Sequence, residues 1–119
     1  MEIKKAMEEV SFKYRGKKLR FKAKKVGFFG RAIGLMFQKR ENAEILLFEF
    51  AKSTKTPIHS MLVFFPFFAV WLDGKSRIVD IKVVPPFTIS VVPKQEFVKL
   101  IEIPLSQKYS SLTEIFPRR

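Results

Sequence analysis

The chain has 119 residues, a length that fits one domain over residues 1–119, and its 47 % hydrophobic content with 14 Phe predicts a packed core rather than disorder. The absence of Cys and the single His exclude disulfides, thiolate catalysis, Cys-based zinc sites and histidine clusters. The formal net charge of +12 is uneven, since residues 1–40 hold 13 Lys and Arg against three Glu, whereas residues 41–119 hold ten against eight acidic residues.

Near the N-terminus, residues 10–15 and 19–24 alternate between apolar and polar side chains on either side of Gly16-Lys17-Lys18. A period of two is typical of a half-buried strand, and glycine suits a tight turn, so this region predicts a β-hairpin. Apolar side chains would face the core. The outer face would carry five cations: Lys13, Arg15, Arg20, Lys22 and Lys24.

The following segment changes period. Phe29, Ile33 and Phe37 recur at helical spacing, which predicts one short helix over residues 29–37. Gly34 lies inside that segment at a cost of about 1 kcal/mol relative to Ala, which indicates a close neighbour at its backbone. Both faces of residues 44–50 are mostly apolar, which predicts a central strand.

The longest apolar run, from Met61 to Leu72, has 12 residues and contains Pro66. A membrane-spanning helix needs about 20 residues, so we interpret this run as buried strands that bend at the proline. The N-terminus has no apolar stretch of the kind a signal peptide requires. We therefore expect a soluble, cytoplasmic protein without a transmembrane segment.

Asp73-Gly74 is the strongest turn signal in the chain and predicts a second hairpin. Further strands are predicted on both sides of it, at residues 58–65, 67–72, 77–84, 88–92 and 96–103. Seven or eight short strands with one helix predict a mainly β fold, either a small antiparallel β-sandwich or a partly closed barrel.

A set of short landmarks stands in a fixed order along the chain, at Arg31, Gly34, Leu35, Met36, Phe37, Pro66, Asp73, Glu102 and Pro104. This order resembles an uncharacterised family known as domain of unknown function 192. The resemblance covers about residues 12–104 and leaves residues 105–119 as a short tail. It implies a mostly β, sandwich-like fold with the helical element at residues 31–37.

The chain also departs from the pattern of that family. Many relatives carry a polar Trp-Met-Lys-Asn-Thr segment before the proline and an Asp two residues after it. Here the segment is His-Ser-Met-Leu-Val at residues 59–63, and Phe68 replaces the Asp. Gln38 stands where relatives often have Arg. Any activity of that polar cluster is not supported by this sequence.

Few side chains could perform catalysis. His59 and Ser60 are neighbours, so in a strand they would point to opposite faces and could not pair as base and nucleophile. Asp73, Asp80 and Glu102 could form a carboxylate pair or a hard-metal site, but Asp73 is better explained by the turn and Glu102 by an outward strand face. No phosphate-binding glycine loop is present. The sequence predicts no catalytic residue, cofactor or metal site and argues against an enzyme.

Two functions stay open. The first is a binding or accessory module that contacts a polyanion such as nucleic acid, or a protein, through the basic N-terminal hairpin. The same basic residues are also explained by a solvated strand face that prevents edge-to-edge aggregation. Contact with a membrane surface is a weaker alternative. The second is a small-ligand-binding protein or enzyme with a pocket near Gly34, Pro66 and Asp73, lined by Arg31, His59 and Asp73.

Overall fold

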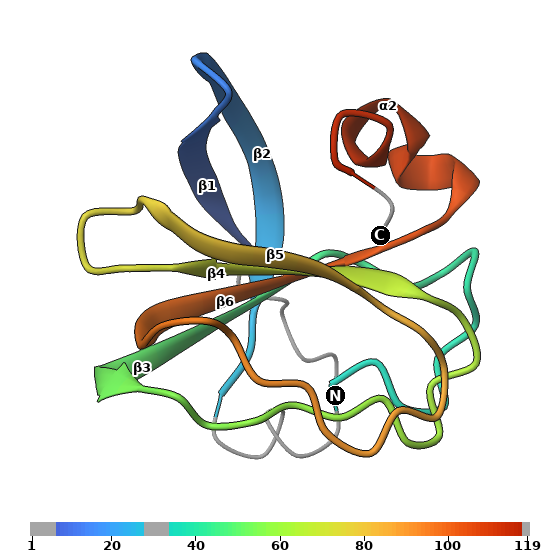
Figure 1. The fold of residues 1–119 in the computed structure, drawn as a ribbon. Helices are drawn as coiled ribbons and strands as arrows, with labels where there is room; N and C mark the ends of the chain where they lie inside the picture. The colour runs from blue at the N-terminus through green and yellow to red at the C-terminus, as the bar shows by residue number, and fades with distance from the viewer. Residues whose placement is uncertain (1–6, 28–33, 118–119) are drawn as a thin grey trace, which may run out of the picture.

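The computed structural model describes residues 7–27 and 34–117, which form a mainly β architecture (Figure 1). One six-stranded sheet has the order β1-β2-β3-β6-β4-β5. The described residues thus supply six strands, fewer than the seven or eight predicted. Their bounds are β1 (Met7–Tyr14), β2 (Lys17–Lys25), β3 (Leu46–Thr54), β4 (Phe67–Leu72), β5 (Ile78–Val84) and β6 (Phe97–Pro104).

The sheet curls into a half-barrel. All neighbouring strands pair antiparallel except β2 and β3, which run parallel and share only the pairs Lys24–Leu46 and Lys25–Leu47. The β1–β2 hairpin can therefore leave the plane of the other four strands and stand over one face of the sheet (Figure 1). β1 comes into contact with β5, the opposite edge of the sheet. The described residues form no second sheet, so the predicted sandwich is not observed.

Two of the predicted strands are loops. Residues 58–65 and 88–92 contact each other through an isolated bridge between Ile58 and Val91 and through hydrogen bonds between Ser60 and Thr88, rather than through a continuous strand ladder. Leu62 and Phe87 adopt left-handed backbone angles, with φ of 63° and 58°, which a strand cannot accommodate. The strand-like composition of residues 58–65 did not reveal these bends.

Within the described residues, the short helix lies near the C-terminus. Residues 34–37 form a turn that ends at Phe37 with a φ of 61°, and residues 28–33 lie outside the described part of the chain. A 3₁₀ turn, η1 (Gln107–Tyr109), leads into α2 (Ser110–Thr113). No helix in the described part of the chain is long and apolar enough to cross a membrane.

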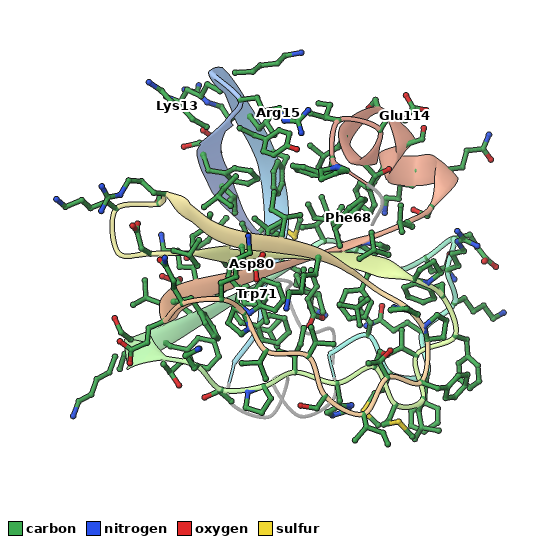
Figure 2. The ribbon with its side chains drawn as sticks, viewed as in Figure 1. Lys13, Arg15, Phe68, Trp71, Asp80 and Glu114 are labelled. Carbon is green, nitrogen blue, oxygen red and sulfur yellow. The ribbon has the colours of Figure 1, made fainter. Side chains whose placement is uncertain are left out.

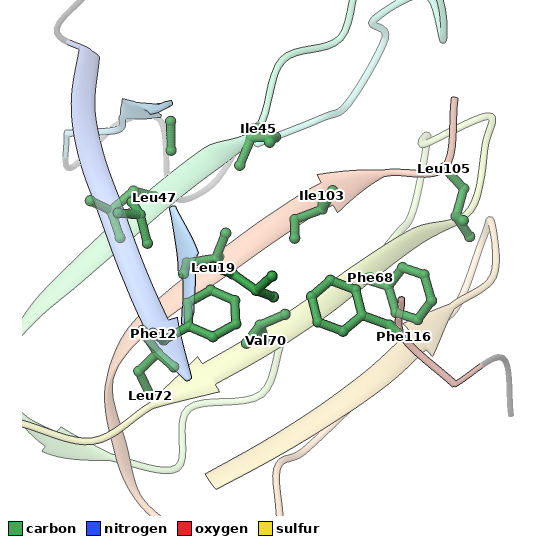
Figure 3. Packing of buried hydrophobic residues seen from close by; sticks show 13 residues of the cluster. Phe12, Leu19, Ile45, Leu47, Phe68, Val70, Leu72, Ile103, Leu105 and Phe116 are labelled. Atoms are coloured by element: carbon green, nitrogen blue, oxygen red, sulfur yellow. The ribbon is translucent and has the colours of Figure 1, made fainter. Parts of the chain in front are cut away.

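The segment predicted as a C-terminal tail is part of the core. Phe116 is buried. Its ring centroid lies 6.4, 5.1 and 5.3 Å from the ring centroids of Phe12, Tyr14 and Phe68, respectively. Figure 3 shows Phe116 packed with Phe12 and Phe68 between the hairpin and the sheet. We call this side of the sheet the hairpin side. In its core, the inward residues of β1 and β2 pack against Leu47, Val70, Ile101 and Ile103.

The opposite face, the loop side, has a second apolar cluster covered by the long connections (Figure 1). Trp71 and Phe97 are fully buried there. The connections are held to one another through Ser60, which is also fully buried: its hydroxyl donates to the Pro85 carbonyl and accepts from the Thr88 amide, 2.7 Å away. Both faces of the central strands are therefore apolar, as predicted for residues 44–50.

Candidate functional site

The register of the N-terminal hairpin is set by its turn. Arg15 and Gly16 have φ values of 51° and 78°, the positive values of a two-residue type I′ turn. This turn pairs Tyr14 with Lys17 and places Lys13 directly opposite Lys18. Lys18, which the sequence placed in the turn, thereby joins the outer surface of the hairpin.

The outer surface of the hairpin carries six cations, which we call the basic face. All but the half-buried Lys24 are exposed, while Val10, Phe12, Leu19 and Ala23 on the inner surface are buried. Figure 2 shows Lys13 at the end of the hairpin, and the Arg15 guanidinium lies over the Tyr14 ring, 5.3 Å from its centroid. The basic face consists of Lys13, Arg15, Lys18, Arg20, Lys22 and Lys24.

Acidic side chains neutralise little of this charge. Arg20 lies 3.4 Å from Glu9, and both side chains are about 60 % exposed, so the pair contributes little to stability. In the part of the chain that the structure describes, Lys13, Lys18, Lys22 and Lys24 have no carboxylate within ion-pair distance. Directly opposed like charges such as Lys13 and Lys18 destabilise a strand pair, and an anion between them would relieve that repulsion.

The basic face continues into a groove of about 460 Å³ between the two hairpin tips. Lys13, Arg15 and Lys18 line one side, and Lys75 and Arg77 from the β4–β5 turn line the other. Arg77 donates from Nε to the Asp73 carboxylate at 2.9 Å, so it is already paired. Lys75 extends the positive surface beyond the first hairpin.

The aromatic residues of the hairpin face inward. Phe12 is buried and meets Phe21 edge to face, with ring centroids 5.7 Å apart, while Tyr14 packs against Phe116. Stacking on bases requires an exposed ring, so the basic face has charge without a stacking platform.

Of the three residues of the predicted pocket, the structure describes His59 and Asp73 and separates them. Arg31 lies outside the described residues. Asp73 caps the β4–β5 turn, where amide hydrogen bonds from Arg77 and then Lys75 lower the pKa of its carboxyl. His59 lines a cavity that also contains Glu102. Asp73 is four residues beyond the β4 position that pairs with Glu102, about 13 Å along the strand, and does not line this cavity.

This cavity, of about 340 Å³, lies on the loop side of the sheet. Its floor is formed by β3, β4 and β6, and its rim by the turn at residues 34–36 and the loop at residues 56–59. Most of its lining is apolar, including Leu35, Met36, Phe48, Phe50, Phe67 and Leu100.

Glu102 is the acidic residue of the cavity. It is buried, so the prediction that it lies on an outward strand face is wrong. It occupies the central strand β6, between Leu46 on β3 and Ala69 on β4, which are both buried. No hydrogen bond or ion pair reaches its carboxyl from any described residue. Burial without a compensating charge raises the pKa of Glu102 to about 8, so the carboxyl is mostly protonated at neutral pH.

The rim beside Glu102 is held in place by hydrogen bonds. The Gln38 side chain donates to the Gly34 carbonyl at 3.0 Å, and the Phe37 amide donates to the Leu62 carbonyl at 3.0 Å. A Cβ at Gly34 would lie 3.6 Å from the Glu102 Oε1, and the φ of Gly34 is +50°. An added Cβ would thus be in ordinary van der Waals contact, so the positive φ of Gly34, rather than a close neighbour at its backbone, accounts for the glycine.

His59 and Ser60 take separate roles. His59 is exposed at the cavity mouth, and its Nδ1 accepts a hydrogen bond from the Met61 amide at 3.1 Å. Ser60 is fully buried on the other side of the chain. Asp80 is also structural, since it accepts from the Lys94 amide at 2.9 Å and thereby fastens the loop before β6 (Figure 2).

Two site residues were missed from the sequence, and each left a signal. Arg15-Gly16 is itself a complete two-residue turn, which would have returned Lys18 to the strand. Glu102 is the single charged residue in the apolar run from Leu100 to Leu105. An acid within such a run in a central strand indicates a buried carboxyl.

No known family and no curated protein matches the sequence. Two solved structures share the fold. A proposed transcription regulator from Sinorhizobium meliloti 1021 has a TM-score of 0.74 at 16 % identity, over 94 % of this chain and 90 % of its own. A protein of unknown function from Novosphingobium aromaticivorans DSM 12444 has a TM-score of 0.73 at 16 % identity, over 94 % of this chain and 81 % of its own. At this identity the likeness shows the fold alone.

Proposed function

We propose that the chain is a nucleic-acid-binding accessory module whose basic face contacts the phosphate backbone. The observation that carries this proposal is the arrangement of Lys13, Lys18, Lys22 and Lys24 on one exposed strand surface without acidic partners among the described residues. Alternate residues of a strand lie about 6.6 Å apart, close to the spacing of phosphates along a nucleic-acid strand. Binding there would release counterions from the nucleic acid, which favours association.

The same geometry limits the mode of binding. No aromatic ring of the hairpin is free to stack on a base, and long lysines on a flat strand surface reach phosphates rather than base edges. Affinity should therefore be independent of sequence and micromolar or weaker at physiological salt. One structural neighbour is a proposed transcription regulator, which agrees with contact to nucleic acid, but the charge arrangement carries the proposal.

Fluorescence anisotropy with labelled DNA duplexes of two unrelated sequences, at about 50 mM salt, tests this function. The variant K13Q/R20Q/K22Q/K24Q should lose binding. The control K39Q/K52Q/K55Q/K94Q removes four exposed cations elsewhere, so both variants carry a formal net charge of +8 instead of +12. The control should bind within a few-fold of wild type. Equal losses in the two variants, or no binding by wild type, would refute the proposal.

A further inference from the structure

The cavity around Glu102 differs from the basic face in every respect that determines a ligand. It lies on the loop side of the sheet, whereas the basic face belongs to the hairpin. Its lining is apolar and aromatic with one buried carboxyl. Its volume of about 340 Å³ falls at the lower end of the usual range for small-molecule sites.

We propose that this cavity binds a small neutral molecule with a flat apolar body and an amide edge, held by a hydrogen-bonded pair with the Glu102 carboxyl. Phe48, Phe50 and Phe67 line the space that would receive the apolar body. This site is independent of the nucleic-acid-binding function proposed above.

The form of the carboxyl determines the class of ligand. Leu46 and Ala69 flank Glu102 across both neighbouring strands, and no described cation lies near enough to hold it ionised. A protonated carboxyl presents an O–H donor beside a C=O acceptor. The complement of that pair is an acceptor beside a donor, which a cyclic amide presents on one edge.

The rim leaves the carboxyl accessible from the cavity. Glu102 lines the cavity, and its Oε1 would lie 3.6 Å from a Cβ added at Gly34, so the glycine backbone borders the carboxyl at ordinary van der Waals distance. Among the described lining residues His59 is the other titratable group, and its Nδ1 is held by the Met61 amide. A pH dependence of binding with a midpoint near 8 that Glu102→Gln removes would report Glu102.

The experiment follows the binding of 2-quinolinone, a flat bicyclic amide, by NMR shifts of the cavity methyl groups of Leu35, Val63 and Leu100. Wild type should bind this probe about tenfold more weakly at pH 9 than at pH 6, because ionised Glu102 loses its donor. Glu102→Gln keeps a donor beside an acceptor and should retain the affinity without the pH dependence. Glu102→Leu should weaken binding about tenfold or more.

A cationic probe of similar size, 1-naphthylmethylamine, tests the alternative hypothesis that Glu102 binds amines as a carboxylate. If the carboxyl instead served as an anion for amines, this probe would bind better than 2-quinolinone, and Glu102→Gln would abolish its binding. That result overturns the proposal, as does a failure of 2-quinolinone to shift the cavity methyl groups. Unchanged binding of 2-quinolinone by Glu102→Leu would overturn it as well.

Discussion

The buried carboxyl of Glu102 should make the protein less stable as the pH rises from acid to mildly alkaline. The folded state keeps the proton on Glu102 up to a pKa of about 8, whereas the unfolded chain releases it near the ordinary value of 4.5. Between these values the folded protein binds more protons than the unfolded chain, so stability falls with increasing pH. The loss amounts to about 3 kcal/mol at pH 7 and about 4 kcal/mol at pH 8.

Glu102→Gln isolates this effect because it keeps the shape of the protonated side chain and removes its titration. A domain of this size shifts its melting temperature by about 4 °C per kcal/mol. We expect wild type and Glu102→Gln to melt together at pH 4.5 and to differ by about 15 °C at pH 8, with the variant higher. Differential scanning calorimetry across this range measures the difference. Glu114→Gln removes an exposed carboxyl on the C-terminal segment and should keep the wild-type profile.

Parallel melting curves for wild type and Glu102→Gln over pH 4.5–8 would refute the reasoning. Such a result would mean that Glu102 ionises at its ordinary pKa in the folded protein. If Glu102→Gln and Glu114→Gln instead changed the pH dependence of the melting temperature equally, that dependence would be assigned to the net charge of the protein and not to Glu102.

Two further predictions concern packing. Phe67 is buried on β4, whereas Phe64 in the preceding loop is 60 % exposed. Phe67→Ala should therefore lower the free energy of unfolding by about 3–5 kcal/mol and Phe64→Ala by less than about 1 kcal/mol, as measured by urea denaturation. Equal effects would contradict the topology at Pro66. Phe116→Ala should also cost about 3–5 kcal/mol, because its ring fills the hairpin-side core against Phe12 and Phe68; a variant as stable as wild type would show that the C-terminal segment is dispensable.

The sequence predicted the elements whose signals are local. Alternation around Gly16 predicted the first hairpin and its exposed cations, and Asp73-Gly74 predicted the turn between β4 and β5. These predictions depended on side-chain period and turn chemistry, which are set within a few residues.

The failures have a common physical origin in contacts between distant residues. Residues 58–65 have strand-like composition, but the hydrogen bonds of Ser60 to Pro85 and Thr88 fold them into a loop. Phe116 lies in the predicted tail, yet its burial depends on Phe12 and Phe68, 104 and 48 residues away in sequence. To predict the burial of Glu102, one would need to know that β6 lies between β3 and β4. The order of the strands along the chain does not reveal this arrangement.

The salt dependence of DNA binding tests the central claim of a phosphate-contacting basic face most directly. For wild type, the logarithm of the association constant with a duplex should fall linearly with the logarithm of salt concentration. The variant K13Q/R20Q/K22Q/K24Q, measured at low salt where weak binding is retained, should show a slope flatter by about one unit for each removed cation that contacts a phosphate. Identical slopes for wild type and this variant would contradict the account, because the contacts would then lie elsewhere.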